Sequence, residues 1–165
     1  FKDIAYTFIG IFYVVFFIMF IAFISGMENG KILIWYIVFS AWGTDVFAYL
    51  IGKHFGKRKF SKVSPNKTIE GCFAGTLGSV IMNLIFTFAI NQYFGVDISY
   101  LTIAILGIVL SLIGQVGDFS ASVIKRHFEI KDFSELFPGH GGMIDRIDSV
   151  MFIAPFAYLL LTLFL

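Results

Sequence analysis

The sequence predicts an all-α protein, a polytopic bundle of about five transmembrane helices. Of its 165 residues, 58% are hydrophobic and only 14% are charged, whereas about a quarter of a soluble domain is charged. The mean hydropathy is +0.88, and five hydrophobic segments are long enough to cross a bilayer core of about 30 Å. We therefore expect a single membrane domain over residues 1–165, with helices that pack against one another in lipid.

The first two hydrophobic segments lie near residues 4–24 and 32–52. A short turn rich in turn-forming residues joins them at 25–30. Asp45 lies well inside the second segment, in the half that leads to a long basic loop. Tyr49 follows at i+4, so both side chains point toward that same half.

The third segment runs near 71–94, the fourth near 101–119 and the fifth near 143–165. We expect the fourth to continue as a helix through Arg126. The single cysteine, Cys72, excludes an intramolecular disulfide and is expected to be a packing residue. Three glycines early in the third segment let a neighbouring helix approach closely; they are Gly71, Gly75 and Gly78.

The distribution of lysine and arginine predicts the orientation of the chain. Ten of the twelve such residues lie at Lys2 and in the stretches 53–67 and 125–131. With five spans these three places fall on the same side of the membrane. We therefore expect the N-terminus and two loops, 53–70 and 126–142, to be cytoplasmic.

Three aspartates lie where the last two segments meet the second basic loop. Asp118 is near the end of the fourth segment, while Asp145 and Asp148 are spaced to share one face at the start of the fifth. Three carboxylates this close repel one another unless some are protonated or a cation neutralises them. Hard oxygen ligands favour Mg²⁺, which we predict here. The alternative is an ion pair between one acid and Arg146 or Lys125 that only holds the helices together.

A polar face continues from Asp118 toward the end of the same helix. Ser122 and Lys125 follow at i+4 and i+7, so the three residues share a face. A metal ligand, a hydroxyl and an ammonium in this order suit a phosphate chain that reaches from the metal toward water. In the alternative interpretation, Lys125 and Arg126 only extend their charges to the membrane surface.

The two loops add candidate phosphate-binding groups. The glycine-rich stretch 137–142 leads into a helix start, where backbone N–H groups favour an anion. His140 in that stretch either contacts a phosphate or a carboxylate or is a structural or solvated residue. In the first loop, Thr68 is placed to cap the third helix, and Lys67 beside it is a plausible triphosphate site. The alternative is a loop whose charges only set orientation.

Three runs of residues stand out from the apolar background. The longest reads S-x-x-K-R-x-x-x-x-K-D-x-S-x-x-F-P-x-H-G-G-x-x-D-R-x-D over 122–148. Upstream, D-x-x-A-Y-x-x-G-x-x-F-G-K begins at Asp45, and S-P-x-K-T-x-E-G begins at Ser64. Together they resemble the signature of the phosphatidate cytidylyltransferase (CDP-diacylglycerol synthase) family. Because members are usually longer, with further spans before this region, we expect this chain to be the C-terminal part of such a protein.

The resemblance implies that CTP and phosphatidic acid react to give CDP-diacylglycerol and pyrophosphate in phospholipid biosynthesis. It also implies Mg²⁺, with room for a second cation, and a homodimer in the bacterial plasma membrane whose site is open to cytoplasm and lipid. No nucleic acid is expected as a partner. By this resemblance the metal ligands are Asp118, Asp145 and Asp148. The catalytic residues would be these three with Lys125 and Arg126. The substrate-binding residues would be Asp45, Ser64, Lys67, Ser122, Lys131, His140 and Arg146.

Other functions compete with this interpretation. A phosphotransferase that consumes a CDP-lipid also uses intramembrane aspartates, but in D-x-x-D-G and D-x-x-x-D runs that this chain lacks. A nucleotidyltransferase for an ether or archaeal-type lipid is harder to separate from sequence. A transporter or channel requires polar residues through the whole membrane depth. The acids here lie in one half, and we expect the other halves of the spans to be apolar.

Overall fold

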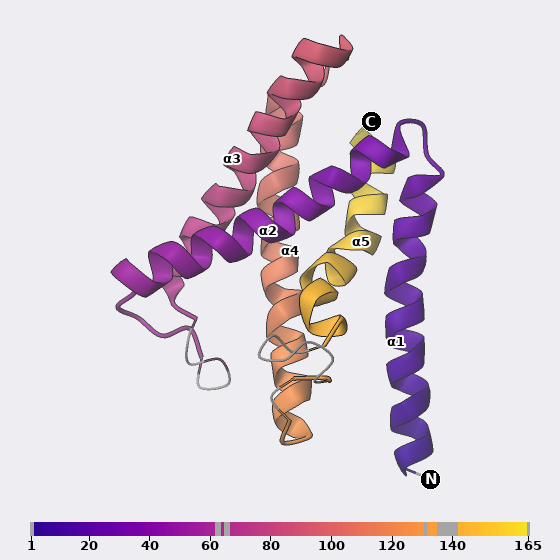
Figure 1. The fold of residues 1–165 in the computed structure, drawn as a ribbon, viewed down its shortest axis with the longest axis vertical. Helices are drawn as coiled ribbons and strands as arrows, with labels where there is room; N and C mark the ends of the chain where they lie inside the picture. Colours follow the sequence, from indigo (N-terminus) through magenta and orange to yellow (C-terminus); the bar gives the residue numbers. More distant parts are fainter. Residues whose placement is uncertain (1, 62–63, 65–66, 131, 135–141, 165) are drawn as a thin grey trace.

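The computed structural model consists of five α-helices in its described residues, and it confirms the predicted all-α bundle (Figure 1). It describes residues 2–61, 64, 67–130, 132–134 and 142–164, except for the side chains of 2–6, 9, 146 and 164. No strand occurs in these ranges, where an isolated bridge joins Lys59 and Thr68. The helices are α1 (Lys2–Ser25), α2 (Gly30–Phe55), α3 (Ile69–Phe94), α4 (Tyr100–His127) and α5 (Ile144–Phe164).

Three of these helices, α2, α3 and α4, are long and apolar enough to cross a membrane. The other two carry shorter apolar stretches, Gly10–Ser25 in α1 and Ile147–Leu163 in α5. The fourth helix extends past Arg126, as expected, and ends at His127. The connection between α2 and α3 is shorter than the expected loop, because α2 continues to Phe55 and α3 begins at Ile69.

The two ends of the bundle differ in what they carry. Figure 1 shows the N-terminus, the end of α4 and the described part of the α2–α3 connection toward the lower side of the view. The α1–α2 turn and the C-terminus lie toward the upper side. The expectation that the N-terminus and the two basic loops lie on the cytoplasmic side of a membrane stays a prediction.

Helices α2 and α3 lie against each other over much of their length because glycines remove the side chains between them. A Cβ atom added at Gly71 would lie 2.8 Å from the carbonyl oxygen of Ala48, and one at Gly75 would lie 2.7 Å from that of Thr44. The prediction of close approach at these glycines is therefore confirmed. This contact fixes the position of Asp45, which follows Thr44 on α2.

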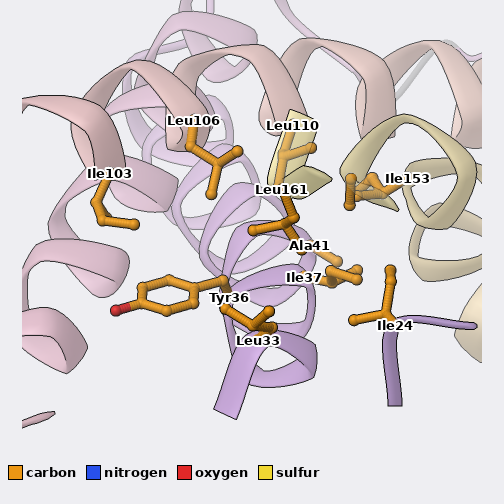
Figure 2. Close-up of a cluster of buried hydrophobic side chains, with 11 residues drawn as sticks. Ile24, Leu33, Tyr36, Ile37, Ala41, Ile103, Leu106, Leu110, Ile153 and Leu161 are labelled. Atoms are coloured by element: carbon orange, nitrogen blue, oxygen red, sulfur yellow. The ribbon is translucent and has the colours of Figure 1, made fainter. Parts of the chain in front are cut away.

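A core of apolar side chains joins α1, α2, α4 and α5 (Figure 2). The contributing positions recur at helical spacing, as in Leu33, Tyr36 and Ile37 on α2 or Ile153, Ala157 and Leu161 on α5, so each helix presents one face. In lipid such contacts stabilise the bundle through close packing, since the surrounding acyl chains are equally apolar. The core lies toward the α1–α2 turn, away from the aspartates.

The expectation that the far halves of the spans are apolar is wrong at several positions of α2 and α3. The Asn83 amide donates to the Ser40 hydroxyl at 2.8 Å, and the hydroxyls of Tyr36 and Thr87 lie 3.1 Å apart. All four side chains are fully buried. They are uncharged and bond to one another, because a polar group inside the membrane has no water to bond and needs a partner within the protein. The sequence pattern missed them because isolated hydroxyl and amide residues do not interrupt an apolar run.

Candidate functional site

A pocket of about 600 Å³ opens between α2, α3, α4 and the α2–α3 connection. Most of its wall is aromatic or aliphatic, including Tyr49, Phe73 and Phe119. Charged and polar side chains lie along the same wall; they are Asp45, Ser64, Lys67, Thr68 and Asp118. A mostly apolar cavity with a few polar groups is typical of a small-molecule site.

An ion pair between Lys67 and Asp118 connects the α2–α3 connection to α4 inside this pocket. The side chains keep 27% and 26% of their exposure, so both remain accessible from the cavity. The Thr68 hydroxyl accepts from the Gly71 N–H at 3.1 Å and begins α3, which confirms the predicted cap. The cap places Lys67 directly before a helix start, where the free N–H groups favour an anion.

Carboxylates from α2, α4 and α5 lie near enough for their charges to act on one another. Asp45 on α2 is repelled by the charges of both Asp118 and Asp148, and Asp148 on α5 is repelled by Asp118. Asp45 lines the pocket, whereas Asp148 is only 8% exposed and accepts from the Ser149 N–H at 2.7 Å. The predicted substrate residue Asp45 is thus part of the acidic cluster, a link that only the helix packing reveals.

A second ion pair lies between α4 and the start of α5. The Lys125 ammonium is 2.9 Å from one Asp145 oxygen, with side-chain exposures of 13% and 7%. The other Asp145 oxygen accepts backbone N–H groups from Phe133 and Gly142, both at 2.9 Å. Lys125 also lies over the Phe133 ring, 5.2 Å from its centroid. Asp145 therefore holds the described ends of the α4–α5 connection against α4.

A divalent cation needs several oxygen ligands around it. Among the described residues, no three Asp, Glu, His or Cys side chains gather closely enough to form a complete metal site. Mg²⁺ in nucleotide sites commonly takes one or two carboxylates and completes its shell with phosphates and water. Asp118 and Asp148 are near enough for their charges to repel each other, and two such carboxylates would supply hard oxygen ligands of the kind that this pattern needs. Asp145 remains a predicted third ligand, and in this structure both of its oxygens already have partners.

The other predicted site residues lie on or beyond the end of α4. Ser122 is half-buried and Arg126 is exposed in the last turns of that helix. Lys131 and His140 lie outside the described residues, as does the side chain of Arg146. Their assigned roles stay predictions.

The inner end of the pocket contains a polar network that the sequence analysis did not identify. The Gln115 amide donates to the Thr76 hydroxyl at 3.1 Å and to the Ser111 hydroxyl at 3.2 Å. The Thr44 hydroxyl donates to Ser111 at 2.7 Å, which ties α2 to α4. Gln115 precedes Asp118 by three residues, so its helical spacing was the available signal that it shares the pocket face.

Fold and site together define a helical membrane protein with a charged, accessible pocket at one end of its bundle. The sequence of residues 1–164 matches the model of the Cytidylyltransferase family. The chain belongs to this family.

Curated relatives carry the name phosphatidate cytidylyltransferase. The chain is 40% identical to the one from Bacillus subtilis (strain 168) over 138 residues, which cover 83% of this chain and 50% of the relative. It is 42% identical to that of Staphylococcus aureus (strain COL), covering 98% of this chain and 60% of the relative. It is 36% identical to that of Thermotoga maritima, covering 96% and 59%. The chain thus spans about half to three fifths of the length of these relatives.

Proposed function

We propose that the protein containing this chain transfers CMP from CTP to phosphatidic acid, giving CDP-diacylglycerol and pyrophosphate in phospholipid biosynthesis. The observation that carries the proposal is the pocket, in which Lys67 and Asp118 face a cavity with largely apolar walls. Such a cavity suits one polyphosphate substrate and one amphipathic lipid, since charged groups bind phosphates while apolar walls contact acyl chains. Family membership and the names of the relatives support this choice of substrates.

In the proposed reaction, a phosphate oxygen of phosphatidic acid attacks the α-phosphorus of CTP. A new P–O bond forms, the bond from the α-phosphorus to the bridging oxygen breaks, and its electron pair leaves with pyrophosphate. The nucleophile is already an anion near neutral pH, so no strong general base is needed. The barrier comes mainly from repulsion between anions and from charge on the leaving group, and positioned cations lower both.

Three cationic side chains are proposed to bind phosphates, namely Lys67, Lys125 and Arg126. Arg126 is exposed at the end of α4, while each lysine is paired with an aspartate in this structure. Binding of the nucleotide would therefore exchange a carboxylate partner for a phosphate partner at Lys67. The exchange is feasible because the pair faces the open pocket and keeps about a quarter of its exposure, so water reaches the separated charges.

We propose that the reaction depends on Mg²⁺ and that Asp118 and Asp148 hold the ion, with phosphate oxygens as further ligands. The ion, when bound, would stabilise charge on the transferred and leaving phosphates. Asp45 is near enough to be repelled by both carboxylates, and its charge would add to the negative field that attracts a cation. Asp145 would contribute by orienting Lys125 or as the additional metal ligand.

We also propose an orientation for the bundle in the membrane and a dimeric assembly. The bundle end that carries the two basic connections would face the cytoplasm, where CTP is available. The resemblance to the family suggests a homodimer. The orientation can be tested with single cysteines that replace Lys53 or Glu28. In intact cells, an impermeant thiol reagent should label the cysteine at position 28 and leave the one at position 53 unlabelled. Cross-linking in native membranes would test the dimer.

The proposed activity is tested directly by the transfer of label from [α-³²P]CTP into chloroform-soluble lipid. The complete protein, in membranes or detergent with phosphatidic acid, should label the lipid when Mg²⁺ is present and not when a chelator replaces it. ATP, GTP and UTP in place of CTP serve as controls for nucleotide choice. No transfer from CTP by the folded protein would refute the proposed reaction.

A further inference from the structure

The α2–α3 connection folds back on itself just before α3 begins. Lys59 and Thr68 form an antiparallel bridge, and the Phe60 N–H donates to the Lys67 carbonyl at 2.9 Å. The Ile69 N–H donates to the Arg58 carbonyl at 3.0 Å. Two short stretches, 58–60 and 67–69, are therefore paired side by side, and Lys67 belongs to one of them.

Glu70, in the first turn of α3, joins this paired segment to its own helix. Its carboxylate accepts the backbone N–H groups of Lys57 and Arg58, each at 3.2 Å. Glu70 is not among the residues that line the pocket. Its negative charge also lies near a helix N-terminus, where the helix dipole favours it. The carboxylate thus fixes the start of the connection to the start of α3.

The paired segment contacts α4 at two described places, both at the pocket. Lys67 forms its ion pair with Asp118, and the Phe60 ring meets the Phe119 ring edge-on with centroids 5.7 Å apart. Phe60, Lys67 and Phe119 all line the cavity. The shape of the connection therefore decides where the Lys67 ammonium stands relative to Asp118.

We propose that Glu70 is a positioning residue for the nucleotide. By holding the Lys57 and Arg58 backbone, it keeps the 58–60 stretch paired with 67–69 and so keeps Lys67 and Phe60 over the pocket. The inference rests on the proposed function, in that Lys67 is taken to bind a phosphate of CTP. A neutral acceptor of the same length performs this role too, because the N–H groups require an oxygen acceptor and not a charge.

The test compares Glu70→Ala, Glu70→Gln and the control Glu28→Ala in the complete protein. Glu28 is exposed in the turn between α1 and α2. We expect Glu70→Ala to raise KM for CTP about tenfold with a smaller change in kcat, because displacing a binding group by an ångström costs up to about a hundredfold. Glu70→Gln should restore most of the affinity, and the control should match the parent. Hydrogen exchange at the Lys57 and Arg58 amides should be faster in Glu70→Ala only.

The results separate this inference from the proposed function. If the parent protein transfers CMP from CTP but Glu70→Ala keeps the parent KM, the inference is overturned while the function stands. The inference is also overturned if Glu70→Gln raises KM as much as Glu70→Ala does. The negative charge of Glu70 would then matter more than its role as a hydrogen-bond acceptor. The exchange measurement needs no activity, so unchanged protection of both amides in Glu70→Ala contradicts the inference even where the parent shows no transfer.

Discussion

The two lysine–aspartate pairs of this chain have the same chemistry and different surroundings. Lys67 and Asp118 face an open pocket and keep about a quarter of their exposure, whereas Lys125 and Asp145 are nearly enclosed between α4 and α5. Water and a ligand reach the first pair, so its partners can be exchanged at low cost. The second pair has lost its hydration, and two backbone N–H groups donate to its carboxylate in place of water. Separating this pair therefore costs much free energy. We infer that the first pair serves binding alone, whereas the second also holds α4 against α5.

The largest effect is expected for Asp118→Asn. The change removes both the partner of Lys67 and a proposed metal ligand while keeping the side-chain shape. We predict a loss of CMP transfer on the order of 10²–10³-fold, the range typical for removing one preorganised electrostatic group. The amount of protein in the membrane should not change. Transfer at the parent rate would contradict the role assigned to the pocket.

Lys125→Met should lower stability in addition to weakening phosphate binding. It leaves the Asp145 carboxylate, whose side chain is 7% exposed, without its cation, and breaking a buried pair from one side costs about 3 kcal/mol. Thermal unfolding in detergent should show a clearly lower midpoint. The double variant Lys125→Met, Asp145→Leu should recover much of the loss, because no unpaired charge remains. If Lys125→Met alone is as stable as the parent, the Lys125–Asp145 pair has no structural role that separates it from the Lys67–Asp118 pair.

Lys67→Met should act mainly on nucleotide binding. The pair faces the open pocket and is partly screened by water, so it contributes less to stability than the enclosed pair, and the unfolding midpoint should stay close to that of the parent. KM for CTP should rise roughly tenfold, corresponding to about 1.4 kcal/mol of lost binding. A large drop in thermal stability with unchanged KM would reverse the roles assigned to the two pairs.

The smallest effect is expected far from both pairs, at Asn83→Ala. This change removes the bond to Ser40 inside the bundle, and interhelical hydrogen bonds in membranes contribute about 0.6 kcal/mol on average. A small decrease in thermal stability with normal KM and kcat is the expected outcome. Loss of transfer in this variant would indicate that the buried polar groups of α2 and α3 take part in function.

The fold was predictable from sequence because long apolar runs have few alternatives in lipid. The Thr68 cap and the glycine contacts of α3 were also predictable, since each depends on local geometry. The partners of the charged residues were not predictable from the sequence. Whether Asp118 meets Lys67 or Lys125 depends on how helices cross, and no local pattern carries that information. For the same reason the sequence did not place Asp45 beside Asp118, nor Glu70 under the α2–α3 connection.

We propose that CTP binds in the pocket between α2, α3 and α4. Cys72 lines that pocket, is half-buried and is the single cysteine of this chain, so it can report occupancy. The measurement is the rate at which a small methanethiosulfonate reagent modifies Cys72 in the complete protein, with Cys72→Ser as the control for labelling elsewhere. Mg²⁺ with CTP should slow the modification, Mg²⁺ with ATP should not, and Lys67→Met should shift the protection to higher CTP concentration. A rate that stays the same at saturating CTP would place the nucleotide outside this pocket and contradict the account.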